Sequence, residues 1–325
     1  MAAVSDPFAT DSGASGAHAG FTALSSTTPV RQILAKVPAR RSRARRLAAE
    51  ALAIEAEAAQ QAGALGFMAR ILVQTTLPHS RPAANTFLRR NGNLVLSISA
   101  HPLLGLPYGR YPRLLLAWVT TEAVRTKSPT LHLGDTLSGF MAQLGLLPRG
   151  GRWGPIGRPS DQMQRLFGAT IAFTFDGRED GAWHDAGLRV AEQTHLWWSP
   201  KIPDQAALWE SAVTLSPGFF SAVTERPVPV DFRALKVLRS PLALDIYSWL
   251  SYKMSYLERP SKPIPWAALK LQFGSDYGRT RAFKERFLRM LRQVLIVYPA
   301  ARLQVRPAGL QLVPSPTHIS SARRR

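Results

Sequence analysis

The chain of 325 residues carries 41 Lys and Arg against 21 Asp and Glu, and this net charge of +20 requires an anionic partner, first nucleic acid and second an anionic membrane surface. A hydrophobic content of 46% can build the cores of two ordinary domains, and the absence of cysteine excludes disulfides and thiolate metal sites. No run approaches the ~18 apolar residues of a membrane span and no signal-peptide core is present, so we expect a cytoplasmic protein without a membrane partner.

The N-terminal part predicts a disordered tail over residues 1–29, because it is rich in Ala, Ser, Gly and Thr without apolar periodicity. Residues 30–64 combine a basic arm with an Ala-rich helix. The arm, 30–46, contains seven Lys or Arg and no acid, which fits either a segment that follows a phosphate backbone or a solubilising patch. The helix over 47–61 has little to bury, so it is a linker or a partner-docking segment.

A first compact domain is predicted over residues 65–213. A strand over 93–99 is followed by a helix over 112–124, an extended piece over 130–133, and a helix that Asp135 opens and Gly145 ends.

The predicted elements continue after a loop rich in Gly and Arg at 148–159. Ser160 is expected to cap the next helix, and the alternation over 171–175 and 188–190 predicts a hairpin around a loop at 176–187. Pro227-Val228-Pro229 is then interpreted as a stiff linker to the second domain.

The second domain, over 214–315, repeats this order. A helix over 241–256, a brief extended piece at 264–266 and a short helix closed by Gly274 lead to a basic helix from Thr280. Two alternating runs, 301–306 and 310–313, then flank a Pro-Ala-Gly turn and predict a hairpin. Residues 316–325 form a basic C-terminal tail.

The helix from Thr280 is amphipathic, with Ser275 or Asp276 as its expected cap and Pro299 at its exit. Its apolar stripe is Phe283, Phe287, Met290, Leu291, Val294 and Leu295. Arg281, Glu285, Arg289 and Arg292 lie near the opposite side, with Arg279, Lys284 and Arg286 on the flanks. Such a face suits a polyanion, although a lone basic helix is also typical of a solvated surface.

The order helix, short strand, helix, basic helix, hairpin is that of the winged-helix form of helix-turn-helix, in which the last helix enters the major groove and the hairpin contacts the backbone. Because the order recurs after roughly 130 residues, we predict an α+β fold of two tandem winged-helix domains. We expect Trp118, Trp249, Trp266, Phe283 and Phe287 in the cores.

Several segments also resemble the RepA-type plasmid replication initiators of bacteria. The resemblance rests on LSPGFFSAV (215–223), PVPVDFRALKVLRSPLALDIYSWLSYK (227–253), IPWAALKLQFG (264–274) and GRWGPIGRPSDQMQRLF (151–167). It covers about residues 67–313 and leaves the N-terminal tail and arm outside. These motifs are mostly core and turn residues, so they identify a fold and a family better than a particular DNA site.

The resemblance implies an initiator that binds direct repeats (iterons) in double-stranded plasmid origin DNA, helps to melt an AT-rich region, and recruits the host replication initiator and the replicative helicase. It also implies a homodimer through the first domain that serves repression or holds origins together. By position, the DNA-binding residues would be Arg279, Arg281, Lys284, Arg286, Arg289 and Arg292 on the second recognition helix, Arg302 and Arg306 on its wing, and Arg158, Gln162 and Arg165 in the first domain. Arg281 and Arg289 are the preferred base readers because they project away from the apolar stripe.

No phosphate-binding G-x-x-x-x-G-K-[ST] loop, paired-His nicking site or His-Glu-x-x-His motif is present, and the carboxylates show no paired arrangement. We therefore expect no catalysis, no cofactor and no metal. Two alternatives stay open: a winged-helix transcriptional regulator or autorepressor without a replication role, and a sequence-blind nucleic-acid chaperone or membrane-surface protein.

Overall fold

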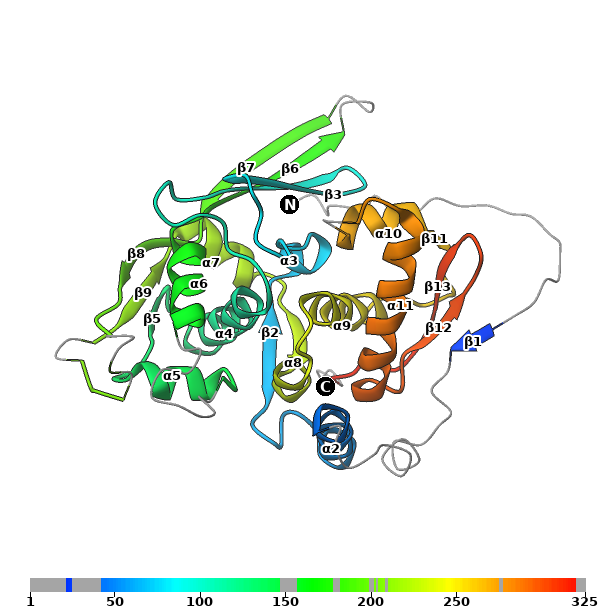
Figure 1. The fold of residues 1–325 in the computed structure, drawn as a ribbon, viewed down its shortest axis with the longest axis horizontal. Helices are drawn as coiled ribbons and strands as arrows, with labels where there is room; N and C mark the ends of the chain where they lie inside the picture. The colour runs from blue at the N-terminus through cyan, green and yellow to red at the C-terminus, as the bar shows by residue number, and fades with distance from the viewer. Residues whose placement is uncertain are drawn as a thin grey trace.

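The computed structural model describes residues 22–24, 42–146, 157–177, 182–198, 202, 204–207, 210–274 and 277–319. Within them the chain is an α+β protein with two large hydrophobic clusters. One is formed by residues between 69 and 223, and the other mainly by residues between 228 and 312, with Leu47, Met68 and Leu114 among the residues that the first half adds to it. Figure 1 shows the sheets of the first half on one side of the molecule and helices α9, α10 and α11 with their hairpin on the other.

The first half contains two antiparallel sheets, in the orders β3-β4-β6-β7 and β5-β9-β8. The strands of these sheets are β3 (Thr86–Asn91), β4 (Leu94–Ser99), β5 (Thr130–His132), β6 (Thr170–Gly177), β7 (Ala182–Arg189), β8 (Ala191–His195) and β9 (Ala212–Leu215). Its helices are α3 (Arg70–Gln74), α4 (Arg110–Thr126), α5 (Leu137–Gln143), α6 (Gly157–Phe167) and α7 (Pro217–Thr224). Buried side chains of α4, including Leu115, Leu116 and Val119, form the middle of this core.

The second half is built around α9, whose two faces are both buried. Its elements are α8 (Phe232–Val237), α9 (Pro241–Met254), β11 (Ile264–Pro265), α10 (Trp266–Phe273), α11 (Thr280–Val297), β12 (Arg302–Val305) and β13 (Gly309–Val313). Strand β13 pairs with both β11 and β12, and β1 (Thr22–Leu24) adds to β12. Residues 22–24, expected in the disordered tail, are therefore a strand in this structure.

Helix α2 (Ser42–Ala56), expected to have little to bury, packs on the second core against α8 and α11. Leu47, Ala48 and Ala51 are buried in that cluster. Arg233 of α8 donates to the carbonyl oxygens of Ala53 (3.1 Å) and Glu57 (2.8 Å) near the C-terminal end of α2, where a basic side chain is favourable. The sequence interpretation missed this docking because small alanine side chains give a weak apolar stripe.

The segment interpreted as a stiff linker is a strand. Strand β10 (Val228–Asp231) pairs antiparallel with β2 (Leu65–Met68), so the chain between the two cores is held by a partner 160 residues upstream. Pairing over this separation leaves no local signal in a Pro-Val-Pro sequence. Phe219 and Val223 of α7 belong to the first core, so the packing changes between α7 and β10, later than the predicted division at 213/214.

Three other local predictions differ from the structure. Helix α6 begins at Gly157, so Ser160 lies inside it, and Thr136 rather than Asp135 caps α5, its side chain accepting from the Gly139 amide. Strands β6 and β7 stay paired out to Gly177 and Ala182, which leaves a far shorter loop than 176–187. For the hairpin, the strand hydrogen bonds continue beyond the apolar residues on which the prediction rested.

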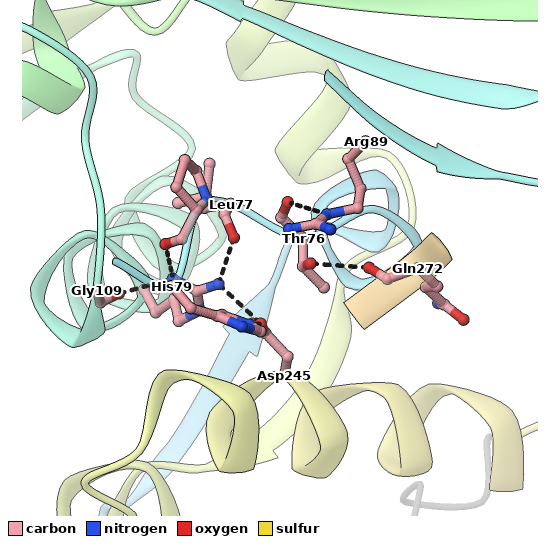
Figure 2. Close-up of polar contacts among 9 residues, drawn as sticks. Thr76, Leu77, His79, Arg89, Gly109, Asp245 and Gln272 are labelled. Atoms are coloured by element: carbon pink, nitrogen blue, oxygen red, sulfur yellow. Dashed lines mark hydrogen bonds and ion pairs between the residues drawn. The ribbon is translucent and has the colours of Figure 1, made fainter. Parts of the chain in front are cut away.

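A buried ion network joins the two cores (Figure 2). The Arg113 guanidinium of α4 donates Nε to Asp245 Oδ1 (2.6 Å) and Nη2 to Asp245 Oδ2 (2.7 Å) on α9. It also donates to the carbonyl oxygens of Leu77, Pro78 and Gly109. His79 Nε2 lies 2.7 Å from the same Asp245 Oδ2. Arg113 is only 4% exposed, so its full hydrogen bonding is what makes this buried cation tolerable.

The segment of residues 74–79, which contains Leu77, Pro78 and His79 of the ion network, also contacts α10. Thr76 Oγ1 donates to the Gln272 carbonyl (2.9 Å), and the Gln272 amide returns a bond to the Gln74 carbonyl (2.9 Å). Arg89 of β3 donates Nε to the Thr76 carbonyl (Figure 2). The helix that precedes α11 is thus tied to the first half by hydrogen bonds as well as by packing.

Beyond β13 the chain crosses the second core, and His318 anchors it. The Tyr247 hydroxyl accepts from the Asp231 amide (2.8 Å) and donates to His318 Nδ1 (2.6 Å), and the Tyr298 hydroxyl donates to the Pro316 carbonyl (2.7 Å). Burial lowers the pKa of His318 from 6.5 to about 4, so the ring is neutral at pH 7 and accepts this bond.

This pKa predicts acid destabilisation. Because the folded-state pKa lies below the unfolded value, His318 contributes stability that is complete above pH 6.5 and is lost as the pH falls toward 4. We expect roughly 2 kcal/mol less unfolding free energy at pH 5 than at pH 7, measured by urea denaturation. His318→Gln should make the unfolding free energy depend less on pH. A smaller dependence of the same sign should remain from His79, because burial also lowers the pKa of His79. His132→Gln, at an exposed imidazole paired with Glu210, is the control. Equal slopes in the wild type and His318→Gln would contradict the assignment.

Candidate nucleic-acid interface

Helix α11 is fixed against the second core by its apolar stripe. The predicted stripe residues are all buried, together with Val297: Phe283, Phe287, Met290, Leu291, Val294 and Leu295. Each such side chain contributes about 1.5–3 kcal/mol when fully buried. The Phe287 ring meets the Phe273 ring of α10 edge to face and the Phe283 ring at a tilt, both at centroid distances of 5.6 Å, which locks α11 to α10. The rotation of the helix is therefore set, and with it the direction of its basic side.

The turn between α10 and α11 depends on Gly274. A Cβ on this residue would lie 2.8 Å from the Phe283 ring, so only glycine lets α11 approach α10 this closely. The predicted caps Ser275 and Asp276 lie outside the described residues. Arg279 is the N-cap residue of α11, and its side chain makes no capping hydrogen bond.

The basic side of α11 faces solvent. Arg279, Arg281, Arg289 and Arg292 are exposed, and Lys284 and Arg286 are partly buried on the flanks. Lys284 Nζ lies 4.8 Å above the Trp266 ring, a cation–π contact that restrains its stem. Arg281 pairs with Glu285 at 3.2 Å, but both side chains are largely exposed (91% and 68%), so the pair is weak and easily exchanged for a phosphate or a base.

The hairpin β12–β13 beside α11 carries the two predicted wing residues in different states. Arg302 is exposed at the start of β12. Arg306 is braced across the hairpin, because its Nε donates to Gln311 Oε1 (2.8 Å) and its Nη2 to Gln304 Oε1 (3.1 Å). Figure 1 shows the hairpin running alongside α11.

The predicted DNA-binding residues of the first half are less accessible to a ligand. Arg158 on α6 is exposed. Gln162 is 3% exposed, accepts from the Tyr108 amide (2.8 Å) and donates to Asp161, which fits a structural role rather than contact with a base. Arg165 pairs with Asp161 at 2.7 Å and lines a cavity of about 360 Å³ together with Arg81. The eleven predicted residues thus fall into two groups. Eight lie on or beside α11 and on its hairpin, and three lie on α6, where Gln162 and Arg165 already have partners within the protein.

Sequence reasoning missed a contact between the two halves, in which Arg110 of α4 donates Nη2 to the backbone carbonyl of Lys236 on α8 (2.7 Å). No local pattern signals this contact, because the two residues lie 126 positions apart. In the parts of the chain that the structure describes, no three His, Asp or Glu side chains are placed to hold a metal ion. Nor is any helix there long and apolar enough to cross a bilayer.

These features define an α+β protein with two linked cores and a solvent-facing basic helix beside a hairpin. Residues 106–267, about half of the chain, match the family model described as plasmid encoded RepA protein. The chain therefore belongs to the RepA family of plasmid replication initiators, as the sequence resemblance indicated. The matched region ends within α10, so it does not include α11 or the hairpin.

Two solved structures are similar to this chain at 13% sequence identity. Crystal structures of domains 2 and 3 of RctB give TM-scores of 0.48, covering 74% of this chain and 95% of that one, and 0.47, covering 76% and 96%. No curated protein matches the chain.

Proposed function

We propose that this protein initiates plasmid replication by binding iterons in double-stranded origin DNA. The observation that carries the proposal is the exposed arginine side of α11, on a helix whose opposite side is locked into the core. In this proposal α11 lies in the major groove, where Arg281 and Arg289 contact base edges. Arg279, Lys284, Arg286 and Arg292 contact phosphates, and Arg302 and Arg306 bring the hairpin to the backbone.

The second half supports a winged-helix assignment in detail. Its order is α9, β11, α10, α11, β12, β13, and β11 pairs with β13. The first half has the comparable order α4, β5, α5, α6, β6, β7, but β5 pairs with β9, and the β6–β7 hairpin extends a sheet with β3 and β4. We therefore propose two tandem winged-helix domains, the first an elaborated form.

The remaining parts of the proposal follow the family. Opening of an adjacent AT-rich region, recruitment of the host initiator and replicative helicase, and a homodimer through the first domain would be the later steps. Phosphate contacts would supply most of the affinity and make it fall steeply with salt, while base contacts would supply the choice of sequence.

A gel-shift comparison tests the proposal. A duplex carrying the direct repeats of the plasmid's own origin should bind on the order of 10³-fold more tightly than a scrambled duplex of equal length at physiological salt. Equal affinities for the two duplexes would contradict the proposal and favour a protein that binds nucleic acid without regard to sequence. A specific site confined to a promoter, without repeats, would favour the regulator instead.

A further inference from the structure

A cavity opens in the first half of the chain beside the last turn of α6. It has a volume of about 360 Å³, which lies within the range of pockets that hold small ligands. Its walls are formed by residues 81–85, by residues 102–106 and by Arg165 of α6. Apart from Arg81, Asn85 and Arg165, every residue of these walls is apolar or glycine. The cavity therefore combines apolar walls with two cations, and none of the described residues that line it is acidic.

The guanidinium of Arg165 is held in place at the wall of this cavity. Its Nε donates to Asp161 Oδ2 (2.7 Å), an oxygen that also accepts from Gln162 Nε2 (3.1 Å), and its Cζ lies 5.8 Å from the centre of the Tyr108 ring. Its Nη1 lies against Gly105, where an added Cβ would be only 2.6 Å away and would push the guanidinium aside. Because these hydrogen bonds use only Nε, the outer edge of the guanidinium, with Nη1 and Nη2, is left for a ligand in the cavity.

The rim of the cavity carries the second cation and an exposed leucine. Arg81 lines the cavity from the first of the two segments and is exposed. Leu103 is 88% exposed, yet it stands on an ordered turn. Its amide donates to His101 Nδ1 (3.3 Å), and the amides of the next two residues donate to the His101 carbonyl (3.0 and 3.1 Å). A single exposed leucine is ordinary, but this one is held at the edge of a cavity whose walls are apolar.

The apolar walls decide which anion fits the two guanidiniums. A phosphate and a carboxylate both present paired oxygens to arginine. A duplex backbone is a hydrated chain of sugars and phosphates, so it would leave Leu103 and the walls without an apolar partner. Single-stranded nucleic acid is typically held by aromatic rings on which its bases stack, and no aromatic side chain among the described residues lines the cavity. An acidic peptide offers a carboxylate and an apolar side chain on neighbouring residues, so it can satisfy both features.

We propose that this cavity is a docking site for an acidic peptide segment of a partner protein, in which a carboxylate lies next to an apolar side chain. Arg165 and Arg81 donate to the carboxylate, and the apolar side chain packs on Leu103 and the walls. Arg165, which the family resemblance assigned to DNA, serves the partner protein instead. The site lies outside α11 and its hairpin, so it goes beyond the proposed DNA contacts.

The experiment measures the fluorescence anisotropy of labelled peptides with the full chain at physiological salt and without DNA. The probe is a pool of short blocked peptides in which Asp or Glu alternates with Leu, Ile, Phe or Met. One comparison pool has Asn or Gln in place of the acids, and a second has Ser in place of the apolar residues. The wild type should bind the probe saturably and should bind each comparison pool at least about tenfold more weakly.

Variants locate the binding at the cavity. Arg81→Gln and Arg165→Gln should each weaken probe binding roughly tenfold, the effect of one charge-assisted hydrogen bond. Leu103→Ser should weaken it roughly fivefold through the lost apolar contact. Arg125→Gln removes the same charge from an exposed arginine of α4, and Leu88→Ser removes an exposed leucine of β3. Neither control residue lines the cavity, so both variants should bind the probe like the wild type.

The exposed positions keep the test decisive, because Arg81→Gln and Leu103→Ser should fold even if loss of the Arg165–Asp161 pair destabilises α6. The proposal is overturned if the wild type does not bind the probe, if the Ser pool binds as tightly as the probe, or if the control variants lose as much as the cavity variants. It is also overturned if Arg81→Gln and Arg165→Gln leave probe binding unchanged but each reduce the slope of log affinity against log salt for a scrambled duplex by about 0.9, because these arginines then contact DNA phosphates. Since the peptide assay contains no DNA, failure of the DNA-binding proposal leaves its result unchanged.

Discussion

Asp245→Ala is expected to lower the free energy of unfolding by about 3–5 kcal/mol, the cost of leaving a buried charge without its partner. The variant removes both carboxylate bonds from Arg113, which is 4% exposed and cannot turn to water, and one from His79. Burial acts to raise the pKa of Asp245, but the Arg113 charge and the bonds from His79 and Arg113 outweigh it and hold that pKa below its ordinary value. Urea denaturation at pH 7 measures the loss.

The control is Glu122→Ala, which removes the partner of the exposed Arg125 on the same helix α4 and should leave stability nearly unchanged. A second test separates unpaired charge from lost packing. The double variant Arg113→Met/Asp245→Leu removes both charges, so it should be more stable than either single replacement. A loss below about 1 kcal/mol in Asp245→Ala, the range of an exposed pair, would contradict the role assigned to the network.

The network also matters for the site. It holds α9 against α4, and the neighbouring bonds of Thr76 and Gln74 hold α10, to which the phenylalanine cluster fixes α11. Loss of Asp245 therefore loosens the position of α11 relative to the first half without touching an exposed arginine. Such loosening would affect how the two halves of the protein are spaced on DNA, rather than the contacts that α11 makes to one site.

The sequence predicted those elements whose signal is local. The stripe from Phe283 to Leu295 is buried as its three-and-four spacing predicts, and the alternation after Pro299 forms β12 and β13. Trp118, Trp249 and Trp266 lie in the cores as expected. In each case the residues that carry the pattern also make the contact, so no distant partner had to be known.

The larger features that escaped prediction depend on distant partners. Arg113 and Asp245 lie 132 residues apart, and each alone looks like a surface residue on a helix. Strand β10 exists because β2 pairs with it, and α2 docks through alanines that leave little pattern. For the candidate site, the sequence indicated which helix is basic. It could not show that Gln162 is buried under Tyr108 or that Arg110 and Lys236 meet.

The double replacement Arg281→Ala/Arg289→Ala is expected to erase most of the preference for origin DNA. Each good bidentate contact to a base is worth about 1–3 kcal/mol of discrimination, so losing two removes roughly 10²–10⁴-fold in specificity. Both side chains are exposed and do not pack in the core, so the variant should fold like the wild type. The measurement is the ratio of the affinity for the origin duplex to that for a scrambled duplex, at two salt concentrations, in the wild type and in the variant.

Two further variants serve as comparisons. Arg125→Ala/Arg226→Ala removes two exposed arginines remote from α11 and should leave the ratio unchanged, because neither lies on the proposed groove-facing side. Glu285→Gln removes the carboxylate that pairs with Arg281, so it should raise affinity for both duplexes through the added net charge. If the Arg281/Arg289 variant weakens both duplexes equally and keeps the ratio, these arginines contact phosphates, and base reading must be assigned to other residues of α11 or to the first half.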